Sequence, residues 1–544
     1  MSGARGSPSG RPPVVVIGLD SADPATLRRL AAEGRLPSLA AALERGRAVE
    51  LRCVSSVFAG AVWPSIATGR GPGGHGVLHY RQLRPGSLEL VPEAEAEVRS
   101  PFWRTAAAER RRVLVVDVPI AGRPPGEDGG LGEGSMMLEW GPHPPLRPPA
   151  SWPPPLAAEV LRRYGRHPCP DDDPYLRGVR ALRRARDRIA GGAALRSRLV
   201  ADLLSRGPFD LVVAVFAEIH VAGHQFANVD DPGHPCRDPA VAAALGGSPL
   251  EAVYEAVDRA VGSLLARLPG DATVLLASVS SVCPTYGGSG ILPELLERLG
   301  LLVRARAGES GRAKERPGAG RRLRRRLLQA WRAIVPERLR AAVARRVPEA
   351  TRARIATERL EAEVDWARTR AFAIPNEFAG YVRLHVRGRE PGGIVAPDER
   401  EGLRDRIATE VRALRIAGTG EPAALDVIRC DRAFPGECAD WLPDLAIVWN
   451  SGRPIPAVAS ASVGRIENRD PGRRPGHRDD GLLLAWGPGI ADGPPLAGAR
   501  VEDLAPTVLA LLGVTPPTGI EGRPIEALLA APVASPEASP RARP

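Results

Sequence analysis

The sequence predicts an α/β fold with a mostly parallel central sheet and helices on both faces. Short segments that are apolar along their whole length recur along the chain, as in VVVIGL, FDLVVAVF and TVLLAS. Between them lie segments with apolar residues at helical spacing, such as SPLEAVYEAVDRAVGSLLARL. Because a fully apolar strand is buried on both faces, and because helices connect parallel strands, this alternation is typical of a parallel sheet between two helical layers.

The predicted elements follow one another in a regular order. The first strand, 13–20, ends in Asp20 and precedes a segment with helical spacing, 24–46, that stops at a glycine. Later strand-like runs occupy 111–120, 209–219, 272–279 and 481–490, and further helices are expected at 248–268 and 292–300. Side chains that follow the strands should gather beyond the carboxyl edge of such a sheet, where α/β proteins bind ligands.

The chain is longer than one hydrophobic core usually allows, so we expect one large domain with insertions, or two domains. No internal repeat is evident. The expected order is a disordered leader at 1–12, a first core part at 13–302, an Arg-rich helical insertion at 303–365, a small α+β excursion at 366–430, a return to the core at 431–530 that begins with LPDLAIVW, and a disordered tail at 531–544.

Composition indicates a soluble globular protein, since 44% of the 544 residues are apolar and 25% are charged. The net charge of +11 comes almost wholly from arginine, because Lys314 is the only lysine. We read this as a codon bias of the gene and expect no specific nucleic-acid recognition. Arginines gather between Arg321 and Arg346 on a stretch with helical spacing, which is either a solvated surface face or a weak contact for anionic membrane.

The cysteines and the N-terminal segment favour a cytoplasmic location. Six cysteines are scattered without a CxxC pair, which argues against a disulfide framework and against a cysteine-based zinc site. The apolar run VVVIGL is too short for a signal peptide or a membrane span. The sequence leaves the oligomeric state open.

Four residues are candidate metal ligands. Asp20, at the end of the first strand, is either a ligand for a cation or the N-cap of the next helix. His220 and His224, in EIHVAGH, would project from one helix face at a chelating spacing, although two structural histidines would give the same pattern. His477 could join them from a distance and complete three imidazoles, the protein share of a zinc site with one open position. His75, in GGHG, is read as a turn residue.

The order of these motifs resembles the alkaline phosphatase superfamily, specifically its type I phosphodiesterase/nucleotide pyrophosphatase branch. The resemblance runs over about 14–300 and 366–527. It rests on the strand ending in Asp20 and on WPSIATGRGPGGHGV at 63–77, EIHVAGH at 218–224, CPTYGGSGILPELLERLG at 283–300, PGHRDDGLLLAWGPGI at 475–490 and DLAPTVLALLGVTPPTGIEGRPI at 503–525. It implies an alkaline-phosphatase-like sandwich with two zinc ions and phosphodiesterase ancestry.

Carried over residue by residue, the resemblance implies that one of the two metal sites is lost. The family's nucleophilic Ser or Thr stands nine residues before Thr68, where this chain has Ala59. The family's Ser-Asp-His-Gly motif, aligned on Ser278, places its aspartate at Val279 and its histidine at Ser280. Of the groups around that metal only Asp20 remains.

The other metal site is better matched. His224 and His477 correspond to the family's two histidines, and His220 stands where many members have aspartate. Glu218 is expected to orient one of the ligand imidazoles from behind.

These positions lead to a hydrolase-like protein with impaired or lost hydrolysis, a pseudoenzyme that binds at most one zinc ion and retains a phosphorylated small molecule or a partner as its ligand. One alternative is an active one-zinc hydrolase of a phosphate ester that uses His220, His224 and His477. In that case Ser55, Ser56 or Ser65 could replace the missing hydroxyl. Another alternative is a peripheral scaffold that docks on anionic membrane or on a partner through Arg321–Arg346.

Overall fold

The computed structural model describes residues 9–530 except 93–99, 125–129, 142–147, 170–175, 177, 236, 289, 306–346, 348, 377, 470–471 and 473. The expected disordered tail, most of the leader and the Arg321–Arg346 helix therefore lie outside the described residues. Of the Arg-rich insertion, the structure describes mainly the helix α14 (Glu349–Glu363).

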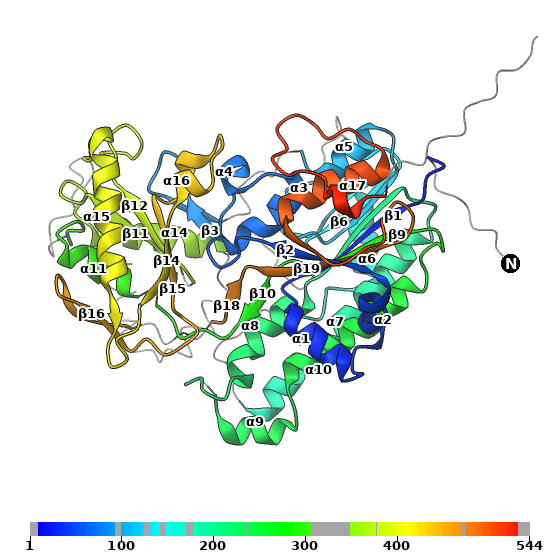
Figure 1. Ribbon diagram of the computed structural model, residues 1–544, viewed down its shortest axis with the longest axis horizontal. Helices are drawn as coiled ribbons and strands as arrows, with labels where there is room; N and C mark the ends of the chain where they lie inside the picture. Colours follow the sequence, from blue (N-terminus) through cyan, green and yellow to red (C-terminus); the bar gives the residue numbers. More distant parts are fainter. Residues whose placement is uncertain are drawn as a thin grey trace, which may run out of the picture.

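A nine-stranded sheet organises the larger part of the molecule (Figure 1). Its strand order is β20 (Leu496–Arg500), β2 (Arg47–Arg52), β19 (Asp480–Trp486), β9 (Thr273–Ser278), β1 (Val14–Leu19), β8 (Leu211–Phe216), β5 (Val113–Val116), β6 (Ser135–Leu138) and β7 (Ala150–Trp152). β19 and β7 pair antiparallel with their neighbours, and the remaining pairs are parallel. The predicted mostly parallel sheet is thus confirmed.

Helices cover both faces of this sheet (Figure 1). In β1, Val15 and Ile17 pack in one hydrophobic cluster and Val14 and Val16 in another, as expected for a strand buried on both sides. One layer contains α1 (Pro24–Ala32), α2 (Pro37–Arg45), α7 (Val179–Leu204), α8 (Glu218–Asp230) and α10 (Pro249–Leu265). The other contains α3 (Val62–Thr68), α5 (Phe102–Ala108) and α17 (Leu504–Leu512).

The segment expected to form one helix at 24–46 forms two, α1 and α2. Gly34 has a φ of 73°, and Pro37 starts the second helix, so the chain turns between them. The N-cap of α1 is Asp23, whose carboxylate accepts a hydrogen bond from the Thr26 amide at 2.8 Å. Asp20 is therefore not the cap, which leaves its carboxylate for another role.

A second, smaller sheet stands beside the main one and has its own hydrophobic cluster (Figure 1). Its strands are β11 (Ala371–Ile374), β12 (Gly380–Leu384), β15 (Leu445–Trp449) and β14 (Ala424–Arg429), all antiparallel, with α11 (Ile291–Arg298) and α15 (Arg400–Ala413) packed against it.

Because of this second sheet, the expected return to the main core at 431 is wrong. The stretch LPDLAIVW forms β15, which pairs with β12 and β14 and not with the main sheet. The chain rejoins the main sheet only at β19. A continuous apolar run signals burial on both faces, and a small antiparallel sheet covered by helices buries its central strands in the same way.

None of the helices that the structure describes is long and apolar enough to span a bilayer.

Candidate metal centre

Two elements far apart in the sequence carry the three candidate histidines. α8 follows β8 directly and buries Ile219, Ala222 and Phe226 against the main core, a spacing that leaves His220 and His224 together on the neighbouring face. His477 lies on β18 (Gly476–Arg478), which pairs antiparallel with β10 (Ser281–Cys283). This two-stranded ribbon continues from the ends of β9 and β19, so the main sheet itself brings His477 to α8.

Gly223 allows α8 to approach the ribbon closely. A Cβ built on Gly223 would lie 2.7 Å from the Cβ of Val282, a distance that real side chains do not tolerate. Val282 is the β10 residue that pairs with His477. The absence of a side chain at Gly223 therefore sets the spacing between the two carriers of the histidines.

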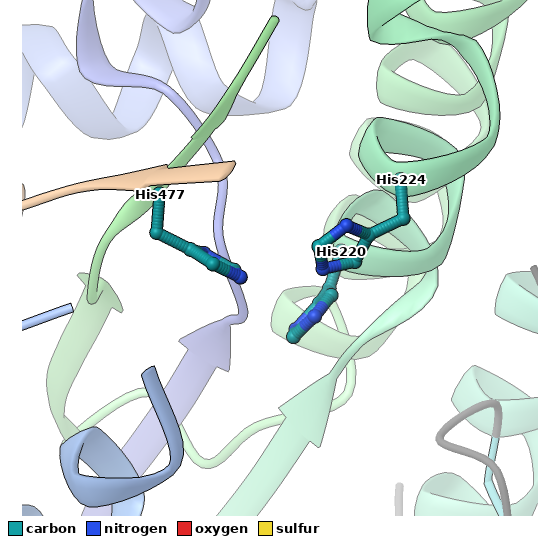
Figure 2. Close-up of side chains that lie close together, drawn as sticks. All are labelled: His220, His224 and His477. Carbon is teal, nitrogen blue, oxygen red and sulfur yellow. The ribbon is translucent and has the colours of Figure 1, made fainter. Parts of the chain in front are cut away.

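The three imidazoles converge (Figure 2). Their ring centroids are 4.7 Å apart for His220 and His224, 4.9 Å for His224 and His477, and 5.3 Å for His220 and His477. One nitrogen of each ring lies within 4.8 Å of the corresponding nitrogens of the other two. All three residues are half-buried, so the cluster remains accessible to a small ligand.

This donor set fits one metal ion. Zinc binds imidazole nitrogen at about 2.0–2.1 Å, so two nitrogens on one ion lie at most roughly 4.2 Å apart. In a tetrahedral site the nitrogens lie roughly 3.4 Å apart, so the rings would have to turn inward to bind one ion. Among the described residues this trio is the group of histidine, cysteine and carboxylate side chains placed to hold an ion.

Asp20 orients one of these histidines instead of joining the trio. Its Oδ2 lies 2.7 Å from Nδ1 of His220, and the carboxylate side chain is nearly buried. Because a carboxylate accepts, Nδ1 of His220 carries the proton and Nε2 presents its lone pair. The expected Asp20 ligand is thus placed as the partner of a ligand imidazole.

Glu218, to which the sequence assigned that orienting role, contacts other groups. Its Oε1 accepts a hydrogen bond from Nε of Arg196 at 3.0 Å and lies 3.2 Å from Nε2 of His167. Arg196 also donates from Nη1 to Asp117 at 2.7 Å, its guanidinium lies over the ring of Trp140, and that ring meets His167 edge to face. The correction has a simple cause, since a residue two positions before His220 on a helix points to a different face.

The charges of this network are fully buried. Arg196 and Glu218 are 0% exposed. Burial alone would raise the pKa of Glu218, but the adjacent Arg196 guanidinium outweighs it and holds the pKa below its usual range. The charged pair therefore ties α7 and the end of β5 to the first turn of the helix that bears His220 and His224.

On the other side of Asp20, hydroxyl groups stand where the resemblance places the second metal. Oγ of Ser21 lies 3.3 Å from Asp20 Oδ1 and 2.9 Å from Oγ of Ser280. Ser280 follows β9 with a φ of 147°, a backbone region that residues with side chains rarely adopt. Val279 is 0% exposed and packs in the hydrophobic cluster of the sheet's other face. Ser280 thus makes a hydroxyl contact, and Val279 makes apolar contacts.

Ala59 starts a short 3-10 turn, Ala59–Ala61, that leads into α3. The segment before it is fixed to the ribbon, because Ser56 donates from its amide and its hydroxyl to the carboxylate of Asp479 at 2.7 and 2.6 Å. Ala59 therefore lies at the start of the turn that leads into α3, and the segment before it is held against the chain just after His477.

Ser65 and His75 form a structural pair. Nδ1 of His75 accepts from the Val77 amide at 3.1 Å, so Nε2 carries the proton and donates to Oγ of Ser65 at 3.0 Å. Burial, together with the nearby Arg70 charge, lowers the pKa of His75 to about 3. In this arrangement His75 is not a base for the Ser65 hydroxyl.

Phe378 is a component of the centre that sequence reasoning missed. It comes from the loop between β11 and β12 of the smaller sheet, and its ring lies 6.0 Å from that of His224 and 5.7 Å from that of His477. A phenylalanine carries no ligating atom, and only the packing of the two sheets places it here. It gives the cluster one apolar wall.

A family profile and a solved structure both match this chain. The family profile of type I phosphodiesterase / nucleotide pyrophosphatase matches residues 14–380 as one range, which spans the Arg-rich insertion and ends before His477. Wild-type alkaline phosphatase PafA superposes with a TM-score of 0.50 at 15% identity, with 96% of this chain and 99% of that chain covered. This likeness confirms the predicted alkaline-phosphatase-like fold.

Two further solved structures align with the chain. Phosphonoacetate hydrolase from Sinorhizobium meliloti 1021, in complex with phosphonoformate, has a TM-score of 0.48 at 14% identity and covers 94% of this chain and 98% of its own. An inactive variant of murine ectonucleotide pyrophosphatase / phosphodiesterase 5, in complex with AMP, has a TM-score of 0.46 at 11% identity, with coverages of 96% and 100%. No curated protein sequence matches the chain. With the profile extending over well more than half of its length, the chain belongs to the type I phosphodiesterase / nucleotide pyrophosphatase family.

Proposed function

We propose that this family member binds one metal ion and a phosphorylated ligand, and that its phosphoester hydrolysis is impaired or lost. The observation that carries the proposal is the replacement of metal-binding side chains after β9. Val279 packs in the core, and the hydroxyl of Ser280 contacts Ser21. Neither side chain offers a carboxylate or an imidazole beside Asp20.

Loss of the nucleophile supports the same conclusion. Ala59 offers only a methyl group, and removal of a nucleophile costs roughly 10⁶-fold in turnover where nothing replaces it. Of the three candidate hydroxyls, Ser56 donates to Asp479 and Ser65 accepts from His75, whereas the buried hydroxyl of Ser55 has no hydrogen-bond partner among the described residues. With one metal position and the nucleophile both missing, activation and charge stabilisation at the phosphorus weaken together.

The histidine trio retains a defined role in this proposal. His220, His224 and His477 would hold one ion, with zinc as the best match to three imidazole nitrogens. When bound, such an ion polarises a phosphoryl oxygen or a water molecule. Asp20 keeps His220 in the tautomer that ligation requires, and Phe378 excludes water from one side.

An active one-zinc hydrolase of a phosphate ester is the second candidate. It is favoured by the same trio, because three protein ligands with one open position are the usual arrangement of catalytic zinc sites. The scaffold alternative depends on Arg321–Arg346, which lies outside the described residues. The proposed cytoplasmic location rests on the sequence alone.

Zinc analysis combined with an assay separates the candidates. Full-length protein, His224→Ala and His477→Ala would be compared by elemental analysis and with a chromogenic phosphodiester and phosphomonoester. We expect about one zinc per chain in the unmodified protein, loss of it in both variants, and turnover no greater than in a metal-free blank. Zinc-dependent turnover that His224→Ala abolishes would establish the one-zinc hydrolase instead, and zinc well below one per chain would contradict both candidates.

A further inference from the structure

A cavity of about 860 Å³ opens along α7, lined by arginine side chains. The arginines are Arg180, Arg183, Arg184, Arg188 and Arg198. Asp187 is the one acidic side chain among the described residues of the lining, and it forms an ion pair with Arg186, at 2.7 Å. The described lining includes none of the residues of the metal centre. The cavity is therefore a separate, strongly positive site.

Two of these arginines are held in place by main-chain oxygens. Arg183 donates to the carbonyl of Ala244 at 2.7 Å, and Arg188 donates to the carbonyl of Pro168 at 2.8 Å. Neither contact removes positive charge. Arg180 and Arg184 have no hydrogen bond or ion pair to any residue in the described part of the chain. Within the described part of the chain, the guanidinium groups are thus partly preorganised and largely without a compensating negative charge.

Their position on α7 is unfavourable for the helix itself. Arg180, Arg184 and Arg188 follow one another at intervals of four, so like charges stand above one another on one face. Arg180 also lies in the first turn of the helix, where the helix dipole disfavours cations. The first turn has no acidic residue, and Gly178 provides no side-chain cap. A bound anion would relieve both sources of repulsion.

We propose that this cavity binds a small molecule that carries several phosphate groups. Guanidinium groups bind phosphate oxygens in pairs, and several of them in one cavity favour clustered phosphates over a single one. The volume lies within the usual range of roughly 300–1,000 Å³ for ligand pockets. Val179 and Leu195 in the lining offer contact for an uncharged part of the ligand.

The test uses inorganic tripolyphosphate as the probe and calorimetric titration of the full-length protein at low salt. The variant Arg180→Gln/Arg184→Gln removes the two unpaired charges and retains good helix formers. We expect at least a 10-fold loss of affinity in this variant, and weaker binding of orthophosphate than of tripolyphosphate to the unmodified protein. The matched control is Arg28→Gln/Arg259→Gln, which removes the same charge from exposed positions on α1 and α10.

The control variant should bind within about 3-fold of the unmodified protein, because exposed charges outside the cavity act only at long range. Equal losses in both double variants would overturn the proposal, since binding would then follow net charge. In His224→Ala the binding that depends on Arg180 and Arg184 should persist, and its loss there would assign the anion to the metal centre. Retention on vesicles containing phosphatidylinositol bisphosphate without binding of free tripolyphosphate would also overturn it, in favour of a membrane surface.

Discussion

Asp20 separates two regions that differ sharply although they share one edge of the main sheet. On its Oδ2 side stand His220 and the two other histidines, which present nitrogen atoms to a common point. On its Oδ1 side stand the hydroxyls of Ser21 and Ser280, which contact each other at 2.9 Å. Hydroxyl groups that bond to one another and to a carboxylate are satisfied without an ion. One region has the side chains of a metal site, and the other is an ordinary polar contact.

The contrast between the two sides of Asp20 would disappear if the side with Ser21 and Ser280 could be made into a metal site. In the triple variant Ala59→Thr/Val279→Asp/Ser280→His, we expect two zinc ions per chain and a gain of several orders of magnitude in phosphodiester turnover. Because Val279 is buried in the core, the new aspartate should destabilise the variant until metal binds it. Zinc should therefore raise its melting temperature more than that of the unmodified protein.

Elemental analysis and melting curves with and without zinc check this prediction, and Ala59→Thr alone serves as the control with one metal position. A triple variant that folds, as judged by circular dichroism, but still binds a single ion would show that Val279 and Ser280 do not occupy the former ligand positions.

A change in the buried charge network behind α8 should have a smaller effect, and this effect concerns the zinc affinity of the three histidines. Arg196→Met removes the tie between Asp117 and Glu218, and we expect zinc affinity to fall about 10- to 100-fold as the histidines lose their fixed spacing. The variant leaves a buried carboxylate unpaired and should also lose about 3–5 kcal/mol of stability.

Arg404→Met separates the effect on the metal centre from the effect on stability. Arg404 is as buried as Arg196 and pairs with Asp444 at 2.7 Å, but it belongs to the smaller sheet's cluster of charges. Asp444 keeps its ion pairs with Arg389 and Arg400, so we expect a smaller loss of stability than in Arg196→Met and an unchanged zinc affinity. Competition with a chelator and the visible spectrum of the cobalt-loaded protein report on the ligand geometry, and equal spectra for the two variants would contradict a positioning role of Arg196.

Gly223→Ala tests the spacing between α8 and the ribbon. The added methyl group would meet Val282, so we expect about 1–3 kcal/mol of destabilisation and a weakening of zinc binding by a few fold. Gly402→Ala on α15 is the matched control, since its Cβ would meet nothing within 4 Å and should stabilise the helix by about 0.5–1 kcal/mol. Denaturant unfolding and zinc titration measure both effects. Unchanged stability and zinc affinity in Gly223→Ala would show that the ribbon can move away from α8 without cost.

The two ends of α8 predict an effect on stability alone, with no change in zinc binding. Glu218 at the start has its pKa lowered by Arg196, whereas burial raises the pKa of Asp230 at the end to about 6. The pKa of an aspartate in the unfolded chain is about 3.9, so between about pH 4 and 6 Asp230 binds a proton in the folded state but not in the unfolded state. The free energy of unfolding therefore declines as the pH rises through this range. Asp230→Asn should remove this decline and stabilise the protein at pH 8 by about 1–3 kcal/mol. Unfolding curves from pH 4 to 8 check it, and parallel pH profiles would contradict the assignment.

Much of the fold followed from the sequence because the main sheet is built from strands with an unmistakable pattern. The runs that end in Asp20, Phe216 and Ser278 are buried on both faces, and this local pattern is enough to predict a parallel sheet. The strand LPDLAIVW shows the limit. Its own pattern is equally apolar, but its neighbours in space decide which sheet it joins.

The candidate site was predictable to the same degree. The spacing of His220 and His224 on one helix face is a local property, and their convergence with His477 agrees with the sequence. The sequence named the right carboxylates, but it assigned the orienting role to Glu218 and the ligand role to Asp20. Which acceptor reaches Nδ1 of His220 depends on the distance between β1 and α8, and that distance is a product of packing.

From the sequence alone we predicted the strand and helix types of the core, the chelating pair, and the positions Ala59, Val279 and Ser280, which the resemblance aligns with the family's nucleophile and two of its ligands. Only the tertiary structure decided that Asp20 supports His220, that Arg196 neutralises Glu218, that Phe378 borders the cluster and that the arginines of α7 line one cavity. The physical reason is the range of the interactions. Periodicity and residue type act between neighbours along the chain, whereas hydrogen bonds and ion pairs join residues that only packing brings together.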